Sequence, residues 1–273
     1  SSLFNVGNTP TLKMQNDGNG LFTEVSGTPF EGVWRSNVTF ADVDGDNDQD
    51  LFITGQIMNQ EVIAKMYSNN SNGVFTEVID TPFVGLHLGG IAFADIDGDN
   101  DLDLILANRD KGQNAIYLNG GNLDFKTSIP FGTGSDETRA VAIGDINGDG
   151  FPDIITANIE EPNYVYFGDQ ELSYQQKAEY DSALAPSFSV SISDIDLDGD
   201  MDIVVANNRT QNSVFMNNGN GESWTEIKVG NEGDGTYDIL VTDLNGDSRP
   251  DIVEANSDKM NIYHMNFLKR KKP

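Results

Sequence analysis

The sequence predicts an all-β protein, a β-propeller whose blades each consist of four short antiparallel strands. Three observations carry this prediction: an aspartate-rich segment recurs five times, its spacing is close to 50 residues, and short apolar segments flank every copy. A repeat of this length matches a propeller blade, in which one unit forms one sheet. A β-sandwich gives no reason for the sequence to repeat, and a parallel calcium-binding solenoid repeats at a period of only about nine residues.

Each aspartate-rich segment spans nine residues, and the first aspartates lie 53, 50, 49 and 49 residues apart. The five segments are 42–50, 95–103, 145–153, 194–202 and 243–251. This even spacing indicates that all five segments occupy the same place in successive blades.

Alternating apolar residues precede each segment, and a period of two predicts a half-buried β-strand. The pairs are Val38 and Phe40, Ile91 and Phe93, Val141 and Ile143, Val190 and Ile192, and Ile239 and Val241. Second strands are expected at 51–54, 102–106, 154–156, 203–205 and 252–253. Third strands are expected at 64–67, 115–118, 164–167, 213–216 and 261–264. A fourth strand is visible in two units, at 75–78 and 224–227, after Asn/Gly turn residues.

The two ends of the chain hold incomplete units. Residues 3–8, 11–15 and 22–25 resemble a second, third and fourth strand, so the N-terminal unit lacks its first strand and its aspartate loop. The C-terminal unit lacks a fourth strand and ends in a basic tail at 269–273. We therefore expect one propeller domain over residues 1–268, with about six sheets, five of them carrying aspartate loops. Either the incomplete units close the ring, or the chain is a fragment of a longer protein.

The formal net charge is −28, from 44 acidic and 16 basic residues, and it argues against nucleic acid as a partner because phosphates would be repelled. Hydrophobic residues (37%) and aromatic residues (9%) are spread along the whole chain, which excludes a disordered acidic tail. No cysteine is present, so disulfides and cysteine-based catalysis or zinc sites are excluded. No stretch approaches the roughly 18 apolar residues of a membrane span. The start at Ser1, without methionine, is typical of a processed or trimmed protein.

The aspartate segments have the composition and spacing of calcium-binding loops. Calcium takes about six to eight oxygen ligands, which short loops supply from side chains and backbone carbonyls. The predicted side-chain ligands, at loop positions 1, 3, 5 and 9, are Asp42, Asp44, Asp46 and Asp50; Asp95, Asp97, Asp99 and Asp103; Asp145, Asn147, Asp149 and Asp153; Asp194, Asp196, Asp198 and Asp202; and Asp243, Asn245, Asp247 and Asp251. The predicted backbone ligands, at position 7, are the carbonyls of Asp48, Asp101, Phe151, Asp200 and Arg249. Magnesium demands a tighter octahedral geometry, and an EF-hand would need flanking helices and a glutamate at position 12.

The fourth loop departs from the pattern at position 4. Glycine stands there in the other four loops and permits a sharp turn, whereas Leu197 stands there in the fourth, followed by Gly199. We therefore expect a different backbone in the fourth loop. Asn147 and Asn245 replace aspartate at position 3, which keeps an oxygen ligand and loses a charge.

The unit Phe-Ala-Asp-Val-Asp-Gly-Asp at 40–46, followed by Asp-Leu and an apolar strand, resembles the FG-GAP/VCBS repeat. That repeat builds the β-propeller of integrin α subunits and of certain fungal and bacterial lectins, and the resemblance covers nearly the whole chain. It implies a propeller, commonly seven-bladed, with calcium between the first two strands of each blade. It also implies an extracellular setting and a role in adhesion or sugar binding. The five loops leave the number of blades open.

No catalytic site is expected. The two histidines, His87 and His264, lie far apart in the sequence, and nearly all aspartate pairs belong to the metal loops. Neither a nucleophile elbow nor a phosphate-binding loop is present. A polysaccharide-active enzyme is a weaker alternative.

A ligand-binding face is predicted opposite the aspartate loops, where strands 2–3 and 4–1 are joined. Residues just before the first strands would gather round a central funnel, and they are Trp34, Arg35, His87, Arg139, Phe188 and Tyr237. Second strands end in amides, which are Asn8, Gln56, Asn108, Asn158, Asn207 and Asn256. These amides either read ligand hydroxyls or hydrogen-bond their own turns.

Together these features predict a secreted or cell-surface module with about five calcium ions, which binds a glycan or an extracellular protein without catalysis. The alternative is a structural propeller that self-associates through its terminal blades or belongs to a larger extracellular protein.

Overall fold

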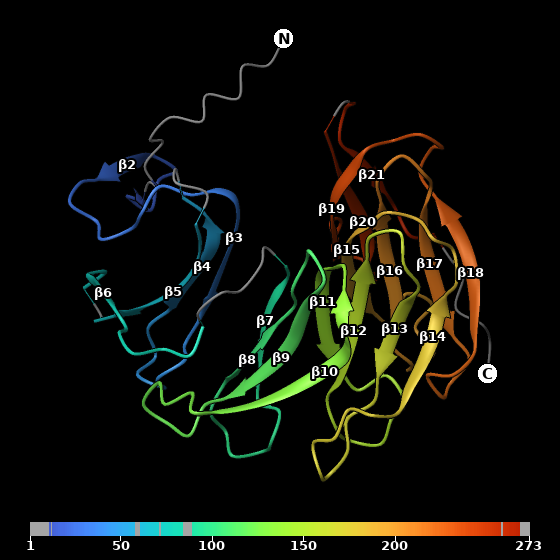
Figure 1. Ribbon diagram of the computed structural model, residues 1–273. Helices are drawn as coiled ribbons and strands as arrows, with labels where there is room; N and C mark the ends of the chain where they lie inside the picture. Colours follow the sequence, from blue (N-terminus) through green and yellow to red (C-terminus); the bar gives the residue numbers. More distant parts are fainter. Residues whose placement is uncertain are drawn as a thin grey trace.

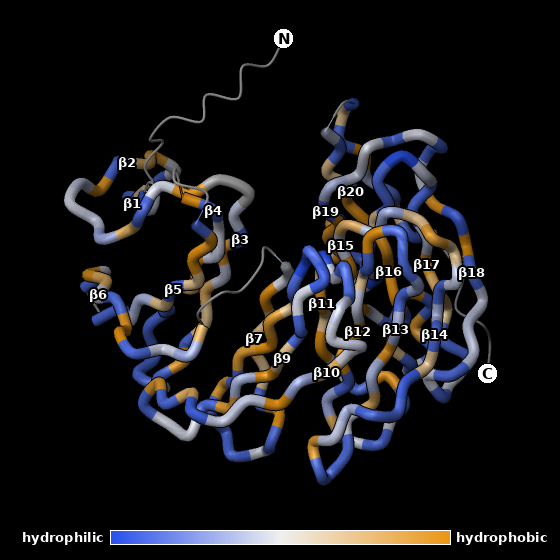
Figure 2. The backbone as a smooth tube through the Cα atoms, in the orientation of Figure 1, coloured by the Kyte–Doolittle hydropathy of each residue, from blue (hydrophilic) through white to orange (hydrophobic). Residues whose placement is uncertain are grey.

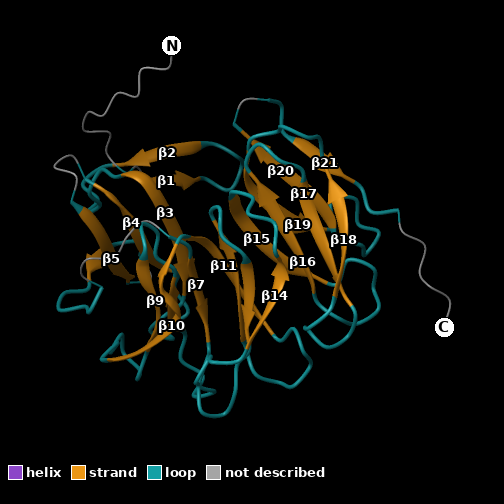
Figure 3. Cartoon of the chain, turned by 45° about the vertical axis from the view of Figure 1, so that its right-hand side comes forward, coloured by secondary structure: helices purple, strands orange, loops and turns teal. Residues whose placement is uncertain are grey.

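The computed structural model describes residues 11, 13–57, 61–70, 72–83, 89–257 and 259–267. In this part of the chain every regular element is a β-strand, and loops make up the rest (Figure 3). The strands form six antiparallel sheets, of which four have four strands, one has three and one has two. The predicted all-β propeller is confirmed, with five blades built on one plan and a small additional sheet at the N-terminus.

The first strand of each blade is the innermost, and neighbouring first strands lie side by side around a common axis (Figure 1). In order around the axis they are β3 (Trp34–Ala41), β7 (Ile91–Ala94), β11 (Thr138–Gly144), β15 (Ser187–Ser193) and β19 (Thr236–Thr242).

The second and third strands form the middle of each blade and pair with each other in antiparallel register. The second strands are β4 (Asp50–Gln56), β8 (Asp103–Leu106), β12 (Asp153–Asn158), β16 (Asp202–Asn207) and β20 (Asp251–Asn256). The third strands are β5 (Val62–Asn69), β9 (Gly112–Leu118), β13 (Asn163–Tyr166), β17 (Asn212–Asn217) and β21 (Ile262–His264).

Fourth strands complete the first four blades, including two that the sequence did not reveal. They are β6 (Phe75–Glu77), β10 (Thr127–Asp136), β14 (Lys177–Asp181) and β18 (Trp224–Val229). The strand β10 contains Pro130, Gly132 and Gly134, which obscure a strand pattern. Proline is tolerated there because β10 is the edge strand of its sheet.

The N-terminal sheet consists of β1 (Lys13–Asn16) and β2 (Phe22–Val25), at the places expected for a third and a fourth strand. It contacts the first blade through Lys13, whose ammonium donates to the Gly73 carbonyl and lies 5.1 Å from the Phe75 ring centroid. The strand predicted at 3–8 and the basic tail at 269–273 lie outside the described residues. Within the described part, the last blade has three strands, as predicted, and β1–β2 pairs with none of them.

The hydrophobic core lies between neighbouring blades, because the second strands of the inner blades are buried on both faces. In β8, Leu104 and Leu106 pack toward the first blade, whereas Ile105 packs toward the third. In β16, Ile203 packs toward the third blade and Val204 toward the fifth. The apolar second strands therefore lie in the interior of the molecule, where Figure 2 shows orange segments.

The two outermost blades have apolar faces with no neighbouring blade. In β3, Val38 and Phe40 are 45% and 56% exposed, although their counterparts in β7 pack against the first blade. In the last blade, Leu240 and Tyr263 are 59% and 66% exposed. We call Val38 and Phe40, together with Leu240 and Tyr263, the end faces.

Candidate functional site

The aspartate loops join the first strand to the second in all five blades, and the position-9 aspartate opens the second strand. This aspartate is at most 1% exposed in every blade. Its Oδ2 accepts the backbone N–H of loop position 2, at 2.8–3.0 Å, in the pairs Val43–Asp50, Ile96–Asp103, Ile146–Asp153, Ile195–Asp202 and Leu244–Asp251. Its Oδ1 accepts an N–H from the end of the third strand, at 2.7–2.9 Å, donated by Asn69, Asn119, Gly168, Asn217 and Asn266. The loop is thereby fixed to two strands of its own blade.

The other aspartates shape the loop through their own backbone. The Oδ2 of position 1 accepts the N–H of position 6, at 2.7–3.1 Å, in all five loops. The Oδ1 of position 5 accepts the N–H of position 7, at 2.9–3.2 Å, in all five loops. Such short-range bonds are why aspartate favours tight turns.

The prediction of a different backbone in the fourth loop is wrong. Position 4 has a left-handed φ in every loop, and Leu197 adopts it with a φ of 60°, close to the 75–80° of the four glycines. Position 6 is also left-handed in all five loops, including Gly199. The hydrogen bonds of the loop and its fixed ends impose the turn on Leu197, at a local cost of about 1–2 kcal/mol.

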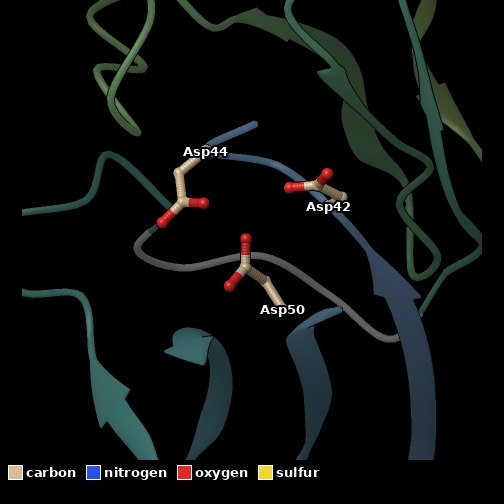
Figure 4. Close-up of side chains that lie close together, drawn as sticks. All are labelled: Asp42, Asp44 and Asp50. Atoms are coloured by element: carbon tan, nitrogen blue, oxygen red, sulfur yellow. The ribbon is translucent and has the colours of Figure 1, made fainter. Parts of the chain in front are cut away.

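Three loops bring carboxylate oxygens within 4.8 Å of one another. The groups are Asp42, Asp44 and Asp50; Asp95, Asp97 and Asp99; and Asp194, Asp196 and Asp202. Figure 4 shows the first group, with its three carboxylates turned toward one another. In this loop Asp42 Oδ1 and Asp48 Oδ2 are buried without a hydrogen-bond partner. Buried oxygens without a partner are costly, and a divalent cation would satisfy them, so the residues fit calcium.

The third and fifth loops have an amide at position 3. The Nδ2 of Asn147 donates to Asp149 Oδ2 at 2.9 Å, and that of Asn245 donates to Asp247 Oδ2 at 3.3 Å. Each amide thus uses its nitrogen within the loop, and its oxygen accepts the N–H of position 5 at 2.9 Å. The assignment of positions 1, 3, 5, 7 and 9 as calcium ligands stays a prediction in all five loops.

The pKa of three position-9 carboxyls is raised to about 6, chiefly by burial and also by the acidic neighbours in the same loop, against two backbone hydrogen bonds that lower it. The residues are Asp103, Asp153 and Asp202. A raised pKa means that the ionised form is disfavoured in its site when no cation is near.

The face opposite the aspartate loops holds a central cavity of about 310 Å³, lined by residues of all five first strands or of the turns that lead into them. We call it the funnel. Three predicted residues, each from the same place in successive blades, meet at its wall: Arg139, Phe188 and Tyr237. The Arg139 guanidinium carbon lies 5.2 Å from the Phe188 ring centroid, and the Phe188 and Tyr237 rings meet edge to face at 5.1 Å.

Arg139 has no acidic side chain in direct contact among the described residues. Within the described residues its side chain takes part in no ion pair, and its buried Nε has no hydrogen-bond partner. Burial lowers the pKa of the guanidinium, and the positive charge of Arg109 lowers it further. Arg109 lies in the turn between β8 and β9, next to the start of β11, where the Thr138 N–H donates to the Asn108 carbonyl at 3.2 Å. Arg109 was not among the predicted residues, although a basic residue in a turn on the funnel side was a signal for it.

The remaining predicted funnel residues are not placed. The side chains of Trp34 and Arg35 and the whole of His87 lie outside the described residues, as does Asn8.

Four second-strand amides bind their own turns. The Nδ2 of each donates to a carbonyl of the following turn, in the pairs Asn108–Gln113, Asn158–Pro162, Asn207–Gln211 and Asn256–Met260. The turn-binding alternative is therefore confirmed for these four residues. A ligand in the funnel would have to form its hydrogen bonds with other groups.

Comparison with known proteins gives one sequence match and several structural ones. The FG-GAP-like repeat pattern matches residues 95–156, 145–205 and 194–254. No curated protein sequence matches the chain. No helix in the described part of the chain is long and apolar enough to cross a membrane.

Among solved structures, the chain is similar to BBS1N in its complex with ARL6DN, at 16% identity and a TM-score of 0.50, over 68% of this chain and 57% of that one. It is similar to Chaetomium thermophilum Raptor at 12% identity and a TM-score of 0.50, over 85% of this chain and 19% of that one. It is also similar to the V. cholerae biofilm matrix protein Bap1 at 18% identity and a TM-score of 0.46, over 91% of this chain and 38% of that one. The chain therefore spans between a fifth and somewhat over half of these proteins, and at such identities the likeness concerns the fold alone.

Proposed function

The chain belongs to the FG-GAP-like repeat family, and from this premise we propose that it is a non-catalytic, calcium-loaded binding module of a secreted or cell-surface protein. The FG-GAP propeller is the fold of a binding or adhesion-type module, and its repeats are typical of extracellular proteins. The ligand in this proposal is a glycan or an extracellular protein, held in the funnel, so the module is lectin-like or adhesive.

Calcium has a structural role in the proposal. FG-GAP repeats often bind calcium, and the acidic clusters of the first, second and fourth loops have the ligand chemistry for it. Five bound ions would reduce the formal net charge from −28 to about −18 and relieve repulsion within each loop. The residues that would hold the ions come from the strand connections on the side away from the funnel, so the ions stabilise the blades and do not touch the ligand.

The observation that carries the proposal is the convergence of Arg139, Phe188 and Tyr237 on one cavity. A guanidinium and two aromatic rings give the funnel a charged and an apolar surface, which is the usual make-up of a small-ligand site. The cavity of about 310 Å³ is at the lower end of the range for such sites, about 300–1,000 Å³.

The test is a glycan-array measurement on the full chain in millimolar calcium, repeated after chelation. Tyr237→Ala should abolish binding, because Tyr237 offers the most exposed ring of the funnel. Tyr263→Ala is the matched control, since it removes an exposed tyrosine from an end face. Binding that survives Tyr237→Ala would place the ligand elsewhere and contradict the proposal. Release of shortened glycans during the assay would contradict the absence of catalysis.

A second function, self-association, is favoured by the end faces. Val38 and Phe40 are exposed on one outermost blade, and Leu240 and Tyr263 on the other, and a second copy could cover the first face with the second. Sedimentation velocity over a wide range of protein concentration tests this function. Assembly that Phe40→Asp abolishes would support it, and a monomer at all concentrations would exclude it.

A further inference from the structure

We propose that the funnel binds a sugar unit bearing a carboxylate, a uronic acid, with Arg139 as the residue that holds the acidic group. This inference rests on the proposed function, because it names the ligand class of the same funnel. It starts from the charge state of Arg139 in a strongly acidic protein.

In a chain with 44 acidic and 16 basic residues, a positive side chain in the wall of the central cavity stands out. Among the described residues, lysines account for the cations that pair with carboxylates, namely Lys65, Lys126, Lys228 and Lys259, whereas Arg109, Arg139, Arg209 and Arg249 are in no ion pair there. Arg139 is in no ion pair within the described residues, although burial makes a lone charge costly. The half-buried guanidinium of Arg139, which lines the cavity without an ion-pair partner among the described residues, can accept an anion from outside the protein.

One acid lines the same cavity, and one of its two carboxylate oxygens is already engaged. Asp238, on β19, accepts a hydrogen bond from the Ser189 hydroxyl at 2.7 Å and from the Ile239 N–H at 2.9 Å, both through Oδ1. It acts on Arg139 only electrostatically. Arg109 acts in the opposite direction, because a second positive charge near the first raises the local potential. The funnel wall therefore carries the positive charge of Arg139 and the carboxylate of Asp238, and Arg109 adds a second positive charge near Arg139.

The surroundings of Arg139 favour a sugar as the carrier of the anion. The guanidinium is a planar fork of donors that matches the two oxygens of a carboxylate. Beside it stand Phe188 and Tyr237, and Tyr237 is 49% exposed, so its ring offers an apolar surface to the C–H face of a sugar ring. Ser36 and Asn37 line the other side of the funnel and present polar groups for hydroxyls.

The size of the funnel argues against a folded protein as the ligand. A stable protein interface buries at least about 1,000 Å² with good shape complementarity, and such a surface does not enter a cavity of about 310 Å³. A single sugar unit, or the end of a chain of such units, is of the right size. An acidic peptide segment is the competing ligand that the experiment must distinguish.

The experiment is isothermal titration calorimetry on the full chain in fixed free calcium. The probes are galacturonic, glucuronic and mannuronic acid, each beside its own neutral methyl ester, and a tetra-aspartate peptide. For the uronic acid that fits best, the ester should bind about tenfold to a hundredfold more weakly, since it loses a charge-assisted pair with Arg139. The comparison of acid with ester needs no variant, so it does not depend on how a substitution folds.

Variants test whether the preference for the acid over its ester comes from Arg139. Arg139→Gln should weaken binding of the acid to the level of its ester and leave the ester unchanged. Arg139→Lys should restore part of the affinity, because the charge returns without the fork. Lys126→Gln is the matched control, as it removes one positive charge that lies outside the funnel, and it should bind the acid like the unmodified chain.

The outcomes separate this inference from the function on which it rests. If neutral sugars bind as well as acids, and Tyr237→Ala abolishes both, the binding module stands and the acidic ligand is refuted. If only the peptide binds through Arg139, the module stands with a protein ligand and the uronic acid is refuted. If an acid binds equally well to Arg139→Gln, the assignment of Arg139 is refuted. If no probe and no arrayed glycan binds, both proposals are overturned.

Discussion

Acidification is expected to stabilise the calcium-free protein and to destabilise the calcium-loaded protein. The reason lies in Asp103, Asp153 and Asp202, which are at most 1% exposed and whose pKa burial raises from 3.8 to about 6. The folded state therefore holds these protons more tightly than the unfolded state. Stability contributed by the protonated carboxyls is complete below about pH 4 and is lost as the pH rises through about 6.

The size of the effect follows from the pKa difference. On moving from about pH 7.5 to about pH 5, each of the three carboxyls regains about 1.4 kcal/mol, because one pH unit below the folded pKa corresponds to that free energy. The sum is about 4 kcal/mol, a large part of the 5–15 kcal/mol that is typical of a domain. With calcium bound, protons compete with the ion for the same oxygens, so acidification releases calcium and lowers the stability.

The assay is urea unfolding followed by circular dichroism at about pH 5, 6 and 7.5, with protein in calcium-depleted buffer and in millimolar calcium. The slopes of unfolding free energy against pH should have opposite signs in the two series. Asp103→Asn should reduce the slope of the calcium-free series by up to about a third, since one of the three carboxyls with the largest rise in pKa is gone. Equal signs in both series would refute the reasoning.

Three further predictions concern single residues. Leu197→Gly should raise the free energy of unfolding by about 1 kcal/mol in a urea titration, because the left-handed backbone strains leucine and not glycine. A loss of stability would mean that the Leu197 side chain packs more strongly than the turn strains it. Asp95→Ala should remove one calcium ion from the native mass spectrum and leave the other ions bound, because neighbouring repeats carry separate loops. An unchanged ion count would mean that this loop was never filled. Asn217→Ala should cost about 1–2 kcal/mol in unfolding by urea, because the Ile146 carbonyl in the preceding blade loses its 2.8 Å hydrogen bond. A cost well below that range would show that a water molecule replaces the side chain as hydrogen-bond donor to the Ile146 carbonyl.

The propeller fold was predictable because its signals are local. The position of each aspartate loop follows from nine neighbouring residues, and the strands on either side follow from alternation and apolar runs. The inward placing of Arg139, Phe188 and Tyr237 was also predictable, because they hold equivalent places in repeated units. In a repeat protein, the place of one residue in its blade predicts the places of the equivalent residues in the other blades.

What could not be predicted depends on contacts between segments distant in the sequence. Leu197 adopts a backbone that leucine disfavours, because the hydrogen bonds of the whole loop outweigh a local preference. The strand β10 forms despite Pro130, because β9 pairs with it along its edge. The proximity of Arg109 to Arg139 arises from the packing of two blades, which no residue pattern encodes.

Asparagines link three of the blades, the second, fourth and fifth, to the aspartate loop of the blade before. The Nδ2 of Asn119 donates to the Val43 carbonyl at 2.9 Å, and Asn217 and Asn266 donate in the same way to Ile146 and Ile195, at 2.8 and 2.7 Å. At the junction between the second and third blades the corresponding residue is Gly168, which has no side chain to donate. A cavity of about 390 Å³ opens at this junction, between the second and third aspartate loops.

On the side of the aspartate loops, the second and third blades are therefore joined by apolar packing, in which Ile96 contacts the cluster around Tyr166 and Tyr174. On the funnel side two hydrogen bonds join them, from the Thr138 N–H to the Asn108 carbonyl at 3.2 Å and from Asn114 Nδ2 to the Thr138 hydroxyl at 2.9 Å. Hydrophobic attraction weakens on cooling, whereas a hydrogen bond between blades does not follow the same trend. Cooling, rather than heating, should therefore weaken this junction more than the other junctions between blades. Near the freezing point the junction should therefore loosen first on the side of the aspartate loops, while the hydrogen bonds on the funnel side still hold the second and third blades together.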